Sequence, residues 1–144
     1  MRCALPGELI AATCARAVRL GVTVGAQVGY PDREGFGRRP IEFEPADLAD
    51  EIRRQIDHLA DVAWQVGADV AYVKPHGALY HRIIHDPVQA RAVRDAVGGL
   101  PLMGMAGTLP AGLPPGPRGR TGALTCCCCS SVASTMRSAA SPPP

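Results

Sequence analysis

Aromatic residues are scarce in this chain of 144 residues, at 4% of the composition, and lysine occurs once, at position 74. Long apolar runs are also missing, and none of the runs present would cross a bilayer, so we expect no membrane span. A chain with so few aromatic rings has little on which to stack nucleic-acid bases. The sequence therefore favours a globular protein that binds neither membranes nor nucleic acid.

Acidic residues are missing from the C-terminal part of the chain, where the last one is Asp95. Residues 110–144 hold three of the fifteen basic residues and no acid. The first 109 residues therefore hold twelve basic and thirteen acidic residues, a net charge of −1. A body so close to neutral has no broad positive field that would attract nucleic acid.

The cysteines give no pattern typical of a disulfide framework. Cys3 and Cys14 are isolated, and the other four are adjacent at positions 126–129. Structural zinc sites separate paired ligands by at least two residues, so this run does not fit one. We therefore expect a reducing, cytoplasmic location.

The C-terminal tail, residues 110–144, has no hydrophobic periodicity and contains seven of the fourteen prolines. Such a composition is typical of a disordered, low-complexity segment, and an abrupt change of this kind is also what a shifted reading frame produces. We therefore expect one folded domain over residues 1–109.

Hydrophobic periodicity in the first 109 residues predicts alternating helices and strands. We expect helices over 7–20, 45–66 and 87–97 and strands over 22–28, 69–73 and 100–105. Asp86 is expected to cap the last helix, the segment around His81 and His85 to form a turn, and Trp64 and Tyr72 to pack. This alternation predicts an α/β fold with parallel strands. Three such units cannot close a barrel, which takes about eight strands.

The most informative motif is VKPHGALY at residues 73–80, which places Lys74 and His76 at the exit of the predicted strand 69–73. Burying a cation and an imidazole there is costly. Ligands bind at this end of the strands in barrels and open α/β sheets. We therefore predict a functional site, with a loop pair that only shapes the turn as the alternative.

A glycine-rich loop at residues 29–40 is the second candidate. Arg38 and Arg39 supply forked donors suited to a carboxylate or a phosphate. Asp32 and Glu34 could instead neutralise these arginines within the loop, and both interpretations stay open. The loop does not have the GxxxxGK[ST] pattern of a phosphate loop, and no HExxH metal motif occurs.

Two segments in this order, GVTVGAQVGYPDREGFGRR at 21–39 and VKPHGALY at 73–80, resemble the LamB/YcsF family, the A component of bacterial 5-oxoprolinase. The resemblance runs from about Glu8 to about Thr108. It implies a partial (β/α) barrel of the glycoside hydrolase/deacetylase type. It also implies ATP-dependent hydrolysis of 5-oxoproline to glutamate, together with two partner subunits.

The resemblance assigns site residues by their motifs. Lys74 and His76 become the catalytic pair. Residues of both motifs become substrate-binding residues, namely Tyr30, Asp32, Arg38, Arg39 and Tyr80. Where many members have histidine after Gly-Ala, this chain has Gln27, which removes one titratable group.

Family motifs expected before residue 8 and after residue 108 are missing, and with them the acidic and histidine residues that would complete the pocket. No metal ligand set is therefore predicted, and His76 would be one orphaned ligand. Two alternatives remain: a truncated, non-catalytic remnant of the A component, and a metal-dependent, deacetylase-like hydrolase of carbohydrate metabolism.

Overall fold

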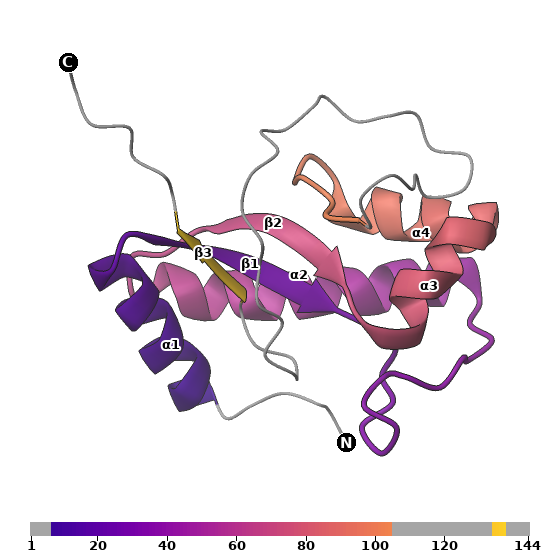
Figure 1. Ribbon diagram of the computed structural model, residues 1–144, viewed down its shortest axis with the longest axis horizontal. Helices are drawn as coiled ribbons and strands as arrows, with labels where there is room; N and C mark the ends of the chain where they lie inside the picture. Colours follow the sequence, from indigo (N-terminus) through magenta and orange to yellow (C-terminus); the bar gives the residue numbers. More distant parts are fainter. Residues whose placement is uncertain (1–6, 105–133, 138–144) are drawn as a thin grey trace.

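The computed structural model describes residues 7–104 and the backbone of residues 134–137, which form four helices and three strands (Figure 1). In chain order these are α1 (Gly7–Arg19), β1 (Val22–Val28), α2 (Pro45–Trp64), β2 (Val70–Pro75), α3 (Gly77–His85), α4 (Pro87–Val97) and β3 (Ser134–Arg137).

The strands form one sheet in the order β2-β1-β3. Strands β1 and β2 are parallel, with a register that runs from Val24↔Val70 to Val28↔Pro75. The predicted α/β fold with parallel strands alternating with helices is confirmed for this pair. Residues 100–105 were expected to add a third parallel strand; of these, the described residues 100–104 contribute a single parallel bridge, between Leu102 and Val73.

Part of the predicted tail differs from the expectation. Ser134–Arg137 forms β3, which pairs antiparallel with β1, although residues 110–144 carry no strand periodicity. The pairing satisfies backbone groups along the edge of β1 that faces away from β2. The rest of the tail, including Cys126–Cys129, lies outside the described residues.

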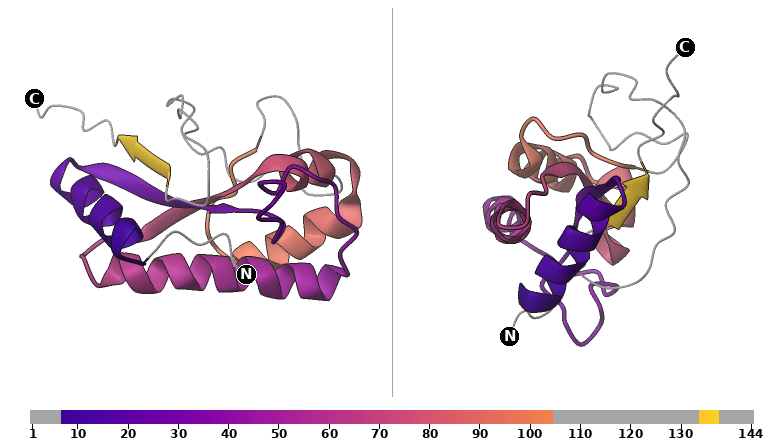
Figure 2. Two further views of the ribbon diagram at one scale, coloured as in Figure 1. Left: turned by 90° about the horizontal axis from the view of Figure 1, so that it is seen from below. Right: turned by 90° about the vertical axis from the view of Figure 1, so that its left-hand side faces the viewer.

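The two faces of the sheet differ in what covers them. Figure 2 (left) shows α2 and α4 along one side of β1 and β2. Val24, Ala26, Val28 and Val73 are buried in the core together with residues of these helices. Because side chains alternate along a strand, Gln27 and the β2 residues next to Val73 project from the opposite face.

Helix α2 shows why this core forms. Its apolar residues recur every three or four positions, which gives a helix one buried stripe. Those buried are Leu48, Ala49, Ile52, Ile56, Leu59 and Ala63. Burying each large one stabilises the fold by about 1.5–3 kcal/mol. Trp64, expected to pack, is instead 76% exposed at the end of this helix, whereas Tyr72 is buried as expected.

Helix α3 occupies the segment that was predicted to turn. It is short, and Leu79 and Ile83 are its two buried residues, one turn apart. Two apolar positions are too few to signal a helix in the sequence. Helix α4 follows directly and is capped as predicted, because the Asp86 carboxylate accepts hydrogen bonds from the amides of Val88 and Gln89.

None of the helices in the described ranges combines the length and apolar character that crossing a membrane requires.

Candidate functional site

The end of β2 is where the two predicted motifs meet. Lys74 was predicted to follow the strand. Strand β2 instead continues through Lys74 and Pro75, so Lys74 lies within it. It pairs in register with Gln27 of β1, and its side chain is partly buried. Tyr72, Lys74 and His76 alternate with the core residue Val73 and with Pro75. They therefore share the sheet face that α2 and α4 leave uncovered.

Tyr72 and Gly25 shape this face below Lys74. They are partners in the register of β1 and β2, and a Cβ atom on Gly25 would overlap the ring of Tyr72. The ring therefore lies across the glycine, where any side chain would displace it. Tyr72 is buried and lies two residues before Lys74 on the same face of β2.

His76 joins the strand exit to the glycine-rich loop. Its backbone amide donates to the carbonyl of Val28 at 2.7 Å, which extends the pairing of β1 and β2. Its ring Nε2 lies 2.9 Å from the carbonyl oxygen of Phe36, and its Nδ1 lies 2.9 Å from Nε2 of Gln27. The imidazole thus connects the sheet to the loop.

A second link joins the loop to α3. The amide of Ala78 donates to the carbonyl of Gly37 at 2.9 Å, so the loop backbone satisfies an amide in the first turn of α3. Gly77 has φ +59°, and a Cβ there would collide with the same carbonyl. This close approach requires glycine at position 77.

Within the loop, Asp32 and Arg39 form an ion pair. Arg39 Nε donates to Asp32 Oδ2 at 2.9 Å, its Nη2 bonds to Oδ1, and the Gly35 amide also donates to Oδ1. The hydrogen bond from Arg39 and, to a lesser extent, that from the Gly35 amide lower the pKa of Asp32 to about 2. For Arg39 the structure therefore favours neutralisation within the loop over an unpaired anion clamp.

This ion pair predicts a pH dependence of stability. Because the pKa of Asp32 is lower in the folded state than its ordinary 3.8, its contribution is present at neutral pH and is lost as the pH falls from about 4 towards about 2. Asp32→Asn should unfold at lower urea concentration than the wild-type chain at pH 7. The difference in urea midpoint between Asp32→Asn and the wild-type chain should become smaller below a pH of about 4.

Glu34→Gln is the matched control in the same loop, because the Glu34 carboxylate is 91% exposed and lies 3.8 Å from Arg39. Its unfolding should follow the wild-type chain across the pH range. A constant gap between Asp32→Asn and wild type at every pH would show that the Asp32 charge does not hold the loop.

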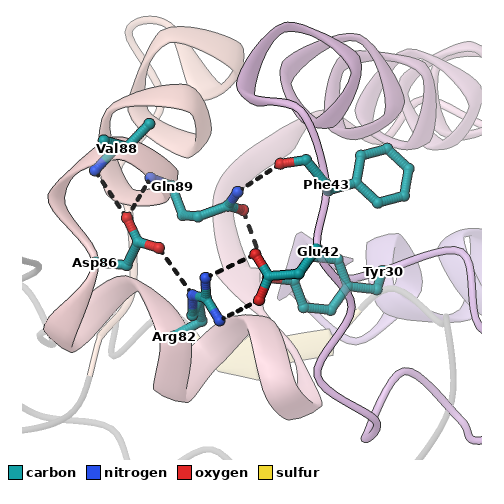
Figure 3. A network of polar contacts seen from close by, with 7 residues as sticks. All are labelled: Tyr30, Glu42, Phe43, Arg82, Asp86, Val88 and Gln89. Atoms are coloured by element: carbon teal, nitrogen blue, oxygen red, sulfur yellow. Dashed lines mark hydrogen bonds and ion pairs between the residues drawn. The ribbon is translucent and has the colours of Figure 1, made fainter.

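A polar network anchors both ends of the loop to α3 and α4 (Figure 3). Arg82 donates to both oxygens of Glu42, at 3.0 and 3.1 Å, and to Asp86 at 2.8 Å. Gln89, which is buried, donates to the carbonyl of Phe43 at 2.8 Å. The amides of α4 and the Arg82 guanidinium lower the pKa of Asp86. The network holds residues 42–43 in place, where the loop runs into α2.

Tyr30 belongs to this anchor. Its side chain is buried and stacks on Phe43 at a ring-centre distance of 6.2 Å, and its hydroxyl donates to Gln89 at 3.5 Å. Burial raises the pKa of the Tyr30 hydroxyl. The described contacts direct Tyr30 towards α4 and not towards Lys74, so a substrate-binding role for Tyr30 stays a prediction.

The remaining predicted residues lie near the same edge. Arg38 is exposed on the loop, directly after Gly37. Tyr80 is partly buried on α3, with its ring edge-on to His81 at 5.6 Å. The structure thus brings His76 to the loop, but it pairs Arg39 within the loop and turns Tyr30 inward.

Two glutamines that hold the loop in place were not predicted from the sequence. Gln55 of α2 accepts from the Gly29 amide at 3.0 Å and donates to the Gly29 carbonyl at 2.9 Å, so it pins the start of the loop. Gln89 holds the other end of the loop through its hydrogen bond to the Phe43 carbonyl. On an amphipathic helix a glutamine resembles any exposed polar residue, so the sequence carries no signal for these roles.

In the part of the chain that the structure describes, no three histidine, cysteine, aspartate or glutamate side chains gather as a metal-ion site would need.

Comparisons with known proteins agree with the two motifs. A family model described as "LamB/YcsF family" matches residues 6–110. The chain is 48% identical over 105 residues to a Kocuria rhizophila protein named as the A component of 5-oxoprolinase, covering 70% of this chain and 42% of that one. It is 50% identical over 99 residues to the protein of the same name from Streptomyces coelicolor, covering 66% and 40%.

A solved structure gives the same result for the fold. The crystal structure of a lactam utilization protein from Thermus thermophilus superposes with a TM-score of 0.67 at 37% sequence identity. The superposition covers 72% of this chain and 43% of that protein. The chain therefore spans about two fifths of the length of the relatives that it matches.

Proposed function

Because the chain belongs to the LamB/YcsF family, we propose that it carries the strand-exit and loop part of the A component of a 5-oxoprolinase. The reaction is the ATP-dependent hydrolysis of 5-oxoproline to glutamate, carried out with two partner subunits. The main observation behind this proposal is the contact between the two family motifs. His76 of one motif is hydrogen-bonded to Phe36 of the other, and both motifs lie within residues 6–110, which the family model matches.

Lactam opening sets the chemical requirements of the site. The lactam oxygen attacks the γ-phosphorus of ATP, and ADP leaves. Water then adds to the activated ring carbon, and the ring nitrogen leaves as an amine after it takes a proton. A second water releases the phosphate and gives glutamate. The protein must therefore stabilise negative charge and move protons beside the ring.

Lys74 is the proposed charge-stabilising group. Its side chain lies partly buried on the sheet face left uncovered by α2 and α4, next to Tyr72. A cation in a partly buried position acts in a lower dielectric than bulk water, which strengthens its interaction with developing negative charge. We assign Lys74 to the oxygen at which negative charge develops.

His76 is the proposed proton carrier for the ring nitrogen, because imidazole is the side chain suited to proton transfer near neutral pH. Its position two residues after Lys74 puts it on the same face of the sheet, where its ring contacts Phe36 of the loop. Arg38, exposed beside Gly37, is the candidate for the carboxylate of 5-oxoproline or a phosphate of ATP. Asp32 and Arg39 keep the loop in shape, and Tyr80 lies on α3 at the edge.

A chimera tests the proposal. The 99 aligned residues of the Streptomyces coelicolor protein are exchanged for those of this chain, and the chimera is combined with the host's two partner subunits. We expect ADP release that depends on 5-oxoproline and glutamate formation in equal amount. The host protein lacking the exchanged segment gives the background. A folded chimera that releases no ADP in response to 5-oxoproline would contradict the proposal.

A further inference from the structure

The two ring nitrogens of His76 face partners of different chemistry. Nε2 faces the carbonyl oxygen of Phe36 at 2.9 Å, and Nδ1 faces the side-chain amide nitrogen of Gln27 at 2.9 Å. Both partners are held in place. Gln27 lies in β1 opposite Lys74, and Phe36 is followed by Gly37, whose carbonyl binds the Ala78 amide.

The Phe36 carbonyl favours a ring proton on Nε2. A carbonyl oxygen only accepts hydrogen bonds, so the contact forms only when Nε2 carries a proton. This holds for the neutral ring and for the doubly protonated ring. Losing the Nε2 proton would place two lone pairs against each other and release the loop from the sheet.

Gln27 leaves the other nitrogen adaptable. Its amide nitrogen only donates, so the arrangement observed places a lone pair on Nδ1 and corresponds to the neutral ring. Half a turn of the same amide would present its oxygen, which accepts from a protonated Nδ1. An amide therefore serves both ring states without moving the backbone, which neither a hydrocarbon nor a carboxylate side chain can do.

We propose that Gln27 is a positioning residue for His76. It holds the neutral imidazole in the Nε2–H form and makes Nδ1 the nitrogen that takes up and releases a proton. The part about the proton-transferring nitrogen rests on the proposed function, whereas the tautomer does not. The other charged groups on the elements around the ring are Lys74 on β2, the Asp32–Arg39 pair with Arg33, Glu34 and Arg38 in the loop, and Arg82 on α3.

Nitrogen NMR of the full chain, labelled with ¹⁵N-histidine, reads the tautomer directly. The chain has four histidines, and comparison with His76→Asn identifies the signals of His76. At mildly alkaline pH we expect Nε2 to have the signature of a protonated nitrogen and Nδ1 that of an unprotonated one. On acidification only Nδ1 should change type. An Nδ1–H ring, or an average of both forms, would overturn the proposal.

Variants of Gln27 test the positioning role. Gln27→Leu removes the amide at similar size and should convert the single form into an exchanging mixture. Gln27→Glu, which keeps the shape and only accepts, should leave both nitrogens protonated at a pH where the wild-type ring is neutral. Gln65→Leu, at an exposed glutamine that ends α2, is the control and should match wild type. Unchanged His76 signals in both Gln27 variants would overturn the role.

The chimera separates this inference from the proposed function. Gln27→Leu in the chimera should lower kcat by up to about 100-fold through misplacement of the ring, with KM little changed. An inactive chimera whose His76 shows the Nε2–H signature would contradict the proposed function and leave the tautomer intact. An active chimera whose kcat is insensitive to Gln27→Leu would overturn the catalytic part of the inference.

Discussion

Replacing Lys74 with methionine in the chimera is expected to lower 5-oxoproline-dependent ATP hydrolysis by about 100- to 1,000-fold, the typical loss when one group that stabilises a developing oxyanion is removed. Methionine keeps the length and the apolar stem of lysine, so the packing around position 74 should change little. The loss should fall mainly on kcat, since the charge interaction is strongest while the negatively charged phosphoryl group is transferred to the lactam oxygen.

Arg53→Met is the matched control for this prediction. Arg53 lies on the exposed side of α2, where it pairs with Asp50, so the substitution removes one positive charge from the helical side of the fold. Steady-state ADP release by the two variants should differ by the full expected factor. Equal activities would remove Lys74 from the mechanism.

Replacing Gly77 with alanine is expected to reduce the free energy of unfolding of the chain by about 2–4 kcal/mol, because two costs add. A non-glycine residue at φ +59° is strained, and the new Cβ would occupy the position of the Gly37 carbonyl. The loop must then retreat, which breaks the bond from the Ala78 amide and draws Phe36 away from His76.

Gly21→Ala separates the two costs. Gly21 has φ +62°, yet a Cβ at this position would meet no atom within 4 Å. The control should therefore show only the backbone strain, about 1–2 kcal/mol. Urea unfolding of both variants gives the comparison, and the His76 nitrogen signals report whether the loop has moved. If both variants lose the same free energy of unfolding and the His76 signals are unchanged, the Gly37 carbonyl does not restrict the side chain at position 77.

The elements that sequence analysis predicted are those with a strong local signal. Helix α2 has six buried apolar residues on one stripe, and α4 begins with a capping aspartate followed by proline. Helix α3 has only two such residues and is stabilised by the loop, which lies about forty residues earlier in the chain. Strand β3 depends on the free edge of β1, so nothing within its own four residues predicts it.

The site likewise combines features with a local sequence signal and features that depend on distant contacts. The resemblance to the LamB/YcsF family, carried by the two motifs, is confirmed, and the strand-exit motif does contact the glycine-rich loop through His76. Arg39 could have faced either the ligand or Asp32, and both are available in the sequence at suitable spacing. The structure shows the pairing with Asp32 because the loop turns at Gly35 and brings the two side chains together. Long-range partners such as Gln27 and Gln55 follow from strand register and helix packing, which local sequence does not contain.

We expect the lactam to bind at the end of β1 and β2, on the sheet face opposite α2 and α4, where His76 is hydrogen-bonded to the loop. A crystal structure of the chimera bound to 5-oxoproline tests it most directly. We expect the lactam oxygen within hydrogen-bonding distance of the Lys74 ammonium, with the ring beside His76 on the face that carries Gln27. A lactam bound on the side of α2 and α4, or away from Lys74 and His76 altogether, would contradict it.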